Sequence, residues 1–175
     1  MIKYIKLLLL VILFGCKEPE TAENLDPFVG MSKVEKDKAL ENAWKASSKK
    51  EQMQIKGYLD RHQIPAKSTK TGVHYYIYQR GDGDNIEDGQ NVLVEYVVTK
   101  INGDTLYTTQ KKLDEFRVSN SEKESGLHEA IKLLKPGSRA IIILPSHRAY
   151  GISGDTDKIP PLTTVIYNLT VKQVN

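Results

Sequence analysis

Most side chains that enzymes use for covalent or metal chemistry are scattered in this sequence. The four histidines, at positions 62, 74, 128 and 147, are not spaced as metal ligands, and the sequence contains no Ser-His-Asp pattern and no phosphate-binding loop. The stretch between Leu144 and Thr163 is different, because it carries Tyr150 between an alanine and a glycine, and Ile159 before two prolines. Loops of this length in a compact domain are usually functional or disordered. We therefore place the candidate site in this loop.

Two strands are predicted to hold the ends of the loop. Residues 140–144 form an apolar run rich in isoleucine, which Pro145 stops. Residues 163–174 alternate in polarity, and one face of this strand carries Val165, Tyr167, Leu169 and Val171. Both strands need a core in which to bury these side chains.

Three further strands are predicted in the same region. Residues 73–79 are rich in aromatic and β-branched side chains, and residues 91–101 and 104–108 follow the same preference. Asn102-Gly103 between the last two is a strong signal for a tight hairpin, so we expect these strands to be antiparallel neighbours.

One helix is predicted within the domain, over residues 121–135. Its apolar side chains recur at helical spacing before Pro136-Gly137, at Leu127, Ala130, Ile131 and Leu134. This stripe should lie against the concave face of the sheet. The predicted fold class is therefore α+β, with the domain at residues 67–175.

Composition limits the number of domains and the kinds of partner. With 175 residues, of which 39% are hydrophobic and 27% charged, the chain has room for one domain of ordinary size with appendages. Removing residues 1–15, with two of the 25 basic side chains, leaves 23 basic against 22 acidic side chains, which predicts no nucleic-acid partner. The acidic cluster at positions 82, 84, 87 and 88 lacks the regular spacing of a calcium loop, so we interpret it as turn chemistry and expect no metal.

The amino terminus resembles a bacterial lipoprotein signal. Residues 1–15 combine two lysines with an apolar run that is too short to span a bilayer as an ordinary helix. Cys16, the only cysteine, follows directly and is the predicted site of lipid attachment. Residues 16–31 would then be a lipidated, flexible tether. The alternative is a buried N-terminal helix with an incidental cysteine.

Residues 32–66 are predicted to be helical. Ser32 and Glu35 have the spacing of a capping box, and Pro65 is the final stop. We expect two helices, with the break at Ser47-Ser48. This segment would either bind a partner or a second copy as an arm, or pack on the domain and face solvent.

Two motifs resemble FKBP-type peptidyl-prolyl isomerases over roughly residues 70–175. The first is the order PSxxAYGxxG, IPP and VIYxLxV near the carboxyl end, and the second is VEYxxxxxNGDTLYTT near the middle. The resemblance implies an FKBP-like antiparallel sheet wrapped around one short helix. It also implies peptidyl-prolyl cis-trans isomerase activity on proline-containing polypeptides, without a cofactor.

The resemblance assigns roles to individual residues. Tyr150 would donate a hydrogen bond to the substrate carbonyl, and an apolar pocket would be formed by Tyr96, Phe116, Leu127, Ile159 and Tyr167. The backbone N–H of Glu124 would also bind the substrate. Two positions depart from the family pattern. Tyr107 stands where the family has an aspartate that helps to position the substrate, and Leu127 stands where it has a tryptophan.

Together these features predict a lipid-anchored isomerase on the periplasmic side of a bacterial inner or outer membrane, where it would assist the folding of envelope proteins. Lipoproteins of this build look similar to those associated with gliding motility in Bacteroidetes-type bacteria, which suggests envelope machinery as a client. The alternative is a binding or assembly module for proline-containing peptides with little turnover, which the departures at Tyr107, Leu127 and Glu124 favour.

Overall fold

The structure, a computed structural model, describes residues 27–110 and 112–175, and the chain divides into two units after Glu41. The predicted signal peptide, Cys16 and residues 16–26 of the predicted tether lie outside the described residues. In the first unit the predicted capping box is confirmed. The Glu35 carboxylate accepts hydrogen bonds from the Ser32 backbone N–H and hydroxyl, both at 2.8 Å, and the Ser32 hydroxyl accepts one from the Glu35 N–H at 3.4 Å.

A single helix, α1 (Lys33–His62), replaces the two helices that the sequence predicts. The predicted break at Ser47-Ser48 is wrong, because serine is only mildly unfavourable in a helix and, unlike proline, keeps its backbone N–H. The helix ends where Gln63 adopts a positive φ of 53°. There the Ile64 N–H bonds to the Leu59 carbonyl at 3.0 Å, and Pro65 follows.

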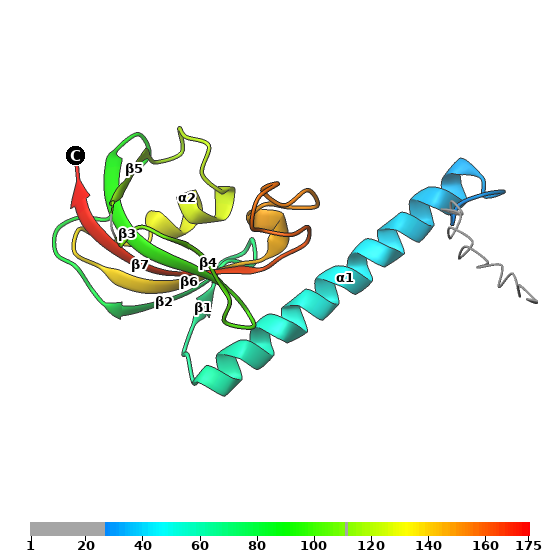
Figure 1. Cartoon of the computed structure of the whole chain (residues 1–175), viewed down its shortest axis with the longest axis horizontal. Helices are drawn as coiled ribbons and strands as arrows, with labels where there is room; N and C mark the ends of the chain where they lie inside the picture. The colour runs from blue at the N-terminus through cyan, green and yellow to red at the C-terminus, as the bar shows by residue number, and fades with distance from the viewer. Residues whose placement is uncertain (1–26, 111) are drawn as a thin grey trace, which may run out of the picture. The chain divides into compact units, whose positions relative to one another are not determined.

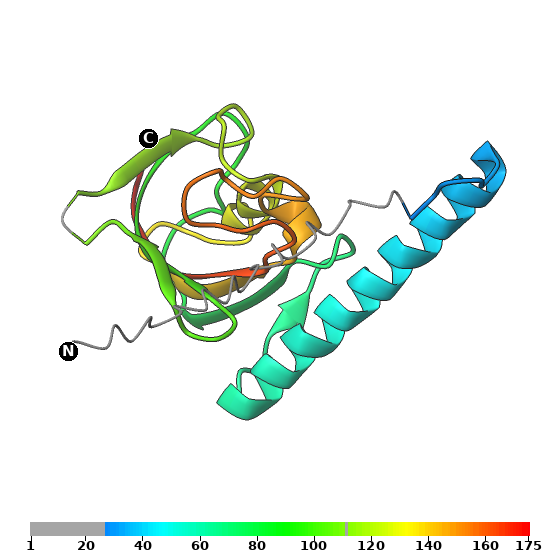
Figure 2. The same cartoon turned by 45° about the vertical axis from the view of Figure 1, so that its right-hand side comes forward.

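Seven antiparallel strands form the sheet of the second unit (Figure 1). Their spatial order is β1-β2-β6-β7-β3-β4, and β5 pairs with β3 beside this path. The strands are β1 (Lys67–Ser68), β2 (His74–Gln79), β3 (Asn91–Lys100), β4 (Thr105–Thr108), β5 (Asp114–Arg117), β6 (Arg139–Leu144) and β7 (Val165–Val174). In both views the sheet curves around α2 (Ser125–Ile131), which confirms the predicted α+β class (Figures 1 and 2).

The predicted hairpin between β3 and β4 is confirmed. Gly103 has a φ of 94°, a left-handed conformation that favours glycine, and its N–H bonds to the Lys100 carbonyl at 3.0 Å. The Lys100 N–H in turn bonds to the Asp104 carbonyl at 3.0 Å. This turn fixes the register of β4 against β3.

The predicted apolar stripe of α2 is confirmed, but the helix is shorter than predicted. Leu127, Ala130, Ile131 and Leu134 are all buried. The helix begins at Ser125 rather than near residue 121, because Glu124 has an extended backbone with φ −58° and ψ 138°. The side chains of Lys123 and Glu124 bond to other elements instead of continuing the helix.

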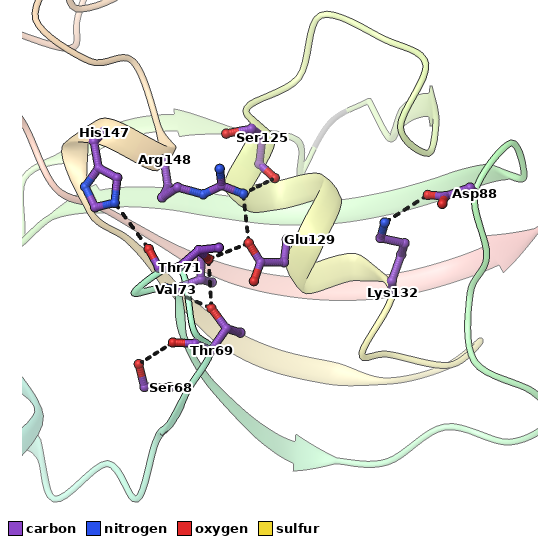
Figure 3. Close-up of polar contacts among 10 residues, drawn as sticks. All are labelled: Ser68, Thr69, Thr71, Val73, Asp88, Ser125, Glu129, Lys132, His147 and Arg148. Atoms are coloured by element: carbon purple, nitrogen blue, oxygen red, sulfur yellow. Dashed lines mark hydrogen bonds and ion pairs between the residues drawn. The ribbon is translucent and has the colours of Figure 1, made fainter.

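Polar contacts hold α2 from both sides (Figure 3). The Glu129 carboxylate accepts hydrogen bonds from the Thr71 hydroxyl at 2.6 Å and from the Arg148 guanidinium at 2.8 Å. Lys132 at the other end bonds to Asp88 at 2.9 Å. The backbone of α2 also lies close to η1 (Ser146–Arg148), because a Cβ on Gly126 would lie 2.8 Å from the Arg148 carbonyl oxygen. The helix is therefore fixed against the segment that leads into the candidate loop.

The second half of α1 packs on the other face of the sheet. Ile55 has no exposed surface and contacts Ile143 and Ile166, which are register partners on β6 and β7. These two alternate with side chains that face α2, so they lie on the opposite face. The Glu51 carboxylate accepts hydrogen bonds from the Ser146 backbone N–H at 2.7 Å and the Thr164 hydroxyl at 2.6 Å.

We expect Glu51→Ala to lower the free energy of unfolding by about 2 kcal/mol, because it leaves the N–H of the buried Ser146 without its acceptor. Chemical denaturation followed by far-ultraviolet circular dichroism measures this loss. Lys50→Ala, at an exposed position of the same helix, is the control and should change stability by less than about 0.5 kcal/mol. Equal losses in the two variants would show that Glu51 does not fasten the helix.

Candidate functional site

The structure brings the six predicted pocket residues together in one apolar cluster. Four are buried members of it, and the other two, Tyr96 and Tyr150, are partly buried against it. The rings of Tyr96 and Tyr167 lie edge to face, with centroids 5.2 Å apart. The six residues of this cluster come from β3, β5, α2, the loop after η1 and β7: Tyr96, Phe116, Leu127, Tyr150, Ile159 and Tyr167.

An open cleft of about 680 Å³ lies against this cluster. Phe116 and Tyr150 are the two predicted residues that line it, and the rest of its lining is polar: Glu115, Arg117, Ser121, Glu122 and Lys123. Leu127 has no exposed surface, and Ile159 and Tyr167 are 3% exposed. The cleft thus has an aromatic wall and the Tyr150 side chain at its edge, while the other apolar residues support it from beneath.

Glu124 places a carboxyl group inside the apolar cluster. It is 6% exposed, and its Oε1 accepts a hydrogen bond from the Tyr167 hydroxyl at 2.6 Å. Its Oε2 has no hydrogen-bond partner among the described residues. Sequence reasoning assigned a role only to the backbone of this residue. The Glu124 N–H bonds to no acceptor in the described part of the chain, so it is free to bind a substrate.

The Tyr150 hydroxyl remains protonated at neutral pH. Burial is the largest cause that raises its pKa above the ordinary value, and the neighbouring Glu124 carboxyl group adds to it. Burial raises the pKa of Tyr167 in the same way, with Glu124 as the next cause. A protonated phenol keeps its donor proton, which is what a hydrogen bond to a substrate carbonyl requires.

Asp114 is a site residue that sequence reasoning missed. Its carboxylate accepts hydrogen bonds from the Tyr96 hydroxyl at 2.7 Å and from the Lys123 ammonium at 2.5 Å. Burial and then this contact with Asp114 raise the pKa of Tyr96. The Lys123 ammonium also lies 5.9 Å from the Phe116 ring centroid, which suits a cation–π contact. A carboxylate therefore stands beside the pocket tyrosine although position 107 supplies none.

Tyr107 holds the loop that carries Ile159. Its hydroxyl donates a hydrogen bond to the Asp155 carboxylate, and this bond is the largest cause that raises the pKa of Tyr107 to about 12. The other Asp155 oxygen accepts the Ile159 backbone N–H at 2.7 Å. A Cβ on Gly154, where φ is 69°, would lie 2.1 Å from the Ile159 carbonyl oxygen. The structure thus places the Tyr107 hydroxyl on this loop.

The stability that the Asp155 hydrogen bonds give to this loop should depend on pH. Burial acts to raise the pKa of Asp155, but hydrogen bonds from Tyr107 and three backbone N–H groups outweigh it and leave this pKa lowered. Because its pKa is lowered in the folded state, the ionised carboxylate adds stability at pH values above the unfolded-state pKa of about 3.9. This stability is lost as the pH falls through the folded-state pKa. We expect Asp155→Asn to destabilise the protein at pH 6, and the difference from wild type to shrink below about pH 4. Urea unfolding between pH 2 and 6 tests this, and a constant difference would contradict it.

Two further observations concern metals and membranes. Among the residues that the structure describes, no three His, Cys, Asp or Glu side chains lie close enough to hold a metal ion. Within the same residues, no helix has both the length and the apolar composition needed to cross a bilayer.

Comparison with known proteins identifies the family of the chain. The family model described as FKBP-type peptidyl-prolyl cis-trans isomerase matches residues 83–172, just over half of the chain. FkpA of Escherichia coli K12, an FKBP-type peptidyl-prolyl cis-trans isomerase, is 31% identical over 111 residues, which are 62% of this chain and 40% of FkpA. A probable isomerase of the same type from Haemophilus influenzae is 28% identical over 109 residues, 62% of this chain and 45% of the relative.

Solved structures show the same fold. The crystal structure of E. coli FkpA superposes with a TM-score of 0.65 at 24% identity, over 80% of this chain and 66% of FkpA. A peptidyl-prolyl cis-trans isomerase from Pseudomonas syringae also gives 0.65, at 23% identity, over 75% of this chain and 95% of that one. The chain spans less than half the length of the two curated relatives it matches here. With a family model over more than half of its residues, the chain belongs to the FKBP-type peptidyl-prolyl cis-trans isomerase family.

Proposed function

We propose that this protein catalyses cis-trans isomerisation of Xaa-Pro bonds in polypeptides bound in the cleft beside Tyr150. Amide resonance sets a barrier of ~18–20 kcal/mol, and unassisted Xaa-Pro bonds interconvert over tens to hundreds of seconds. The reaction makes and breaks no covalent bond, so it needs no nucleophile, metal or cofactor. It needs a site that fits the twisted amide better than either planar isomer.

The main support for this proposal is that the Tyr150 side chain and the Phe116 ring line an open cleft and pack against a buried apolar cluster. The Phe116 ring gives the amide an apolar surface to pack on, which removes water from one side of it and so weakens the dipolar resonance form that makes the bond rigid. The Tyr150 hydroxyl then supplies one directed hydrogen bond to the substrate. An assay of refolding limited by proline isomerisation tests the proposal, and acceleration that grows with protein concentration is the expected result.

A second function fits the same cleft, namely binding of proline-containing segments with little turnover. The buried Glu124 favours it, because its carboxyl group lies close enough to the Tyr150 hydroxyl that catalysis would use to raise the pKa of that hydroxyl. The two functions separate in one experiment. A binding module would retain a proline-containing peptide in equilibrium dialysis and yet leave the refolding rate unchanged at high protein concentration.

We also propose that Cys16 carries a lipid anchor, so that the isomerase works on envelope proteins at the periplasmic side of a bacterial membrane. Support comes from the charged and apolar pattern of residues 1–15 directly before the only cysteine. More than one acyl chain would make the anchor stable. The resemblance to lipoproteins of gliding motility suggests that machinery as one client.

For the anchor we expect Cys16→Ser to abolish incorporation of labelled fatty acid, because serine offers no thiol for attachment. Metabolic labelling followed by immunoprecipitation measures this. Wild-type protein that takes up label is the positive control. Label that persists in the serine variant would place the lipid elsewhere, and wild-type protein without label would exclude it.

A further inference from the structure

A second cavity lies near the C-terminal end of α2, whereas the candidate site lies at its N-terminal end. Its volume is about 280 Å³, at the lower end of the range for small-molecule sites. It is bounded by β2, by the loop that follows β2, and by the connection from α2 to β6. It is lined by Pro65, Lys67, Tyr75, Tyr76, Ile77, Arg80, Asn85, Leu133, Lys135 and Ser138.

The charges around this cavity have one sign. Lys67, Arg80 and Lys135 line it, and none of its lining residues is acidic. Lys67 belongs to the β1–β2 ladder through its backbone, but within the described ranges 27–110 and 112–175 the side chains of Lys67 and Arg80 form no hydrogen bond or ion pair. Lys135 donates one hydrogen bond, to the Gly83 carbonyl at 2.6 Å, which leaves two of its three N–H groups. Three cations that line one cavity give it a positive potential, which favours a bound anion.

Ser138 adds a buried donor to the cavity wall. It is 1% exposed, and its hydroxyl oxygen accepts the Gly81 N–H at 3.1 Å and the Lys135 N–H at 3.0 Å. Both lone pairs of this oxygen are therefore used, and its own proton has no acceptor in the part of the chain that the structure describes. A buried donor without an acceptor is costly, and a bound acceptor would satisfy it.

The wall of the cavity is formed before any ligand binds. The Asp82 N–H bonds to the Pro136 carbonyl at 3.1 Å, and the Ile86 N–H bonds to the Leu134 carbonyl at 3.0 Å. The two loops approach so closely that a Cβ on Gly81 would lie 1.8 Å from the Pro136 oxygen. Little conformational entropy would be lost when a ligand binds between such fixed groups.

We propose that this cavity binds the phosphate group of a small phosphate ester. A guanidinium fork and two ammonium groups match the oxygens of a phosphate ester, which carries one negative charge in a diester and two in a fully ionised monoester, and the Ser138 hydroxyl gives a further donor. Pro65, Ile77 and Leu133 offer an apolar wall for the organic part of the ester. The ester is either a soluble phosphate monoester or the diester headgroup of a phospholipid, since both present free phosphate oxygens.

Isothermal titration calorimetry of the full-length protein tests the proposal with four probes. Phenyl phosphate and inorganic phosphate represent soluble sources, and glycerophosphoglycerol represents a lipid headgroup without its chains. Benzoate is the planar, singly charged comparison. The variant Lys67→Gln/Arg80→Gln removes two cations from the cavity. Lys70→Gln/Arg61→Gln removes the same charge at exposed positions that do not line it.

We expect phenyl phosphate or glycerophosphoglycerol to bind, and the tighter of the two identifies the source. The cavity variant should weaken that binding at least tenfold, while the control variant should leave it within twofold of wild type. The proposal is overturned if no phosphate probe binds, if benzoate binds as tightly, or if both variants weaken binding equally. A cavity variant that fails to unfold cooperatively is replaced by Arg80→Gln alone, for which the same criteria hold.

Discussion

Tyr167→Phe is expected to lower the free energy of unfolding by about 2 to 4 kcal/mol, a large effect for the loss of one oxygen atom. The hydroxyl is the donor to Glu124 Oε1 at 2.6 Å, and Glu124 Oε2 has no partner among the described residues. Removing it leaves most of a buried carboxyl group unsatisfied, and this penalty exceeds the net value of the bond itself.

A double variant separates that penalty from any loss of packing. Tyr167→Phe/Glu124→Leu removes both polar partners, so we expect it to recover most of the lost stability. Tyr78→Phe is a matched control, because its exposed hydroxyl donates to Asn168 at 2.8 Å, and its loss should cost less than about 0.5 kcal/mol. Urea denaturation compares the four proteins. If the double variant is no more stable than Tyr167→Phe, the buried carboxyl group is not the cause.

Tyr150→Phe should reduce isomerase kcat/KM about fivefold to tenfold while the protein stays folded. One neutral hydrogen bond to the substrate carbonyl contributes about 1 kcal/mol, and each 1.4 kcal/mol is a factor of ten. Tyr150 is only partly buried, so the ring can stay in place without its hydroxyl. The measurement is the rate of proline-limited refolding at several protein concentrations, with thermal unfolding as the check on folding. An unchanged kcat/KM would show that this hydroxyl does not act on the substrate.

The apolar framework could be predicted from the sequence because burial leaves a periodic pattern. The stripe from Leu127 to Leu134, the strand from Val165 and the turn at Gly103 all follow from the spacing of side chains or from local backbone preferences. The continuous α1 could not be predicted in this way. Ser47-Ser48 is a weak breaker, and the packing of Ile55 on the sheet is a tertiary contact without a local signal.

The polar partners of the site were harder to predict for a related reason. Asp114 meets Tyr96 from 18 residues away, and Glu124 meets Tyr167 from 43 residues away, so no periodicity marks either pair. One signal for Asp114 was present. Extending the strand of Phe116 by two residues and pairing it with β3 places Asp114 opposite Val94, next to Tyr96 on the same face.

Leu127 is a predicted pocket residue that does not reach the cleft. The residue has no exposed surface, so it supports the cleft without lining it. The tryptophan that the sequence resemblance leads us to expect at this position would need additional volume in a close-packed core. The cleft is lined instead by Phe116, Tyr150 and polar or charged side chains.

NMR exchange spectroscopy directly observes rotation of the Xaa-Pro bond, which we propose that the cleft beside Tyr150 speeds. A short peptide with a single proline gives separate cis and trans signals, which exchange too slowly to be seen without a catalyst. We predict exchange cross-peaks when a small amount of the protein is added, with a rate that is proportional to its concentration and reduced in Tyr150→Phe. Peptide signals that shift on binding but show no exchange at high protein concentration would contradict catalysis.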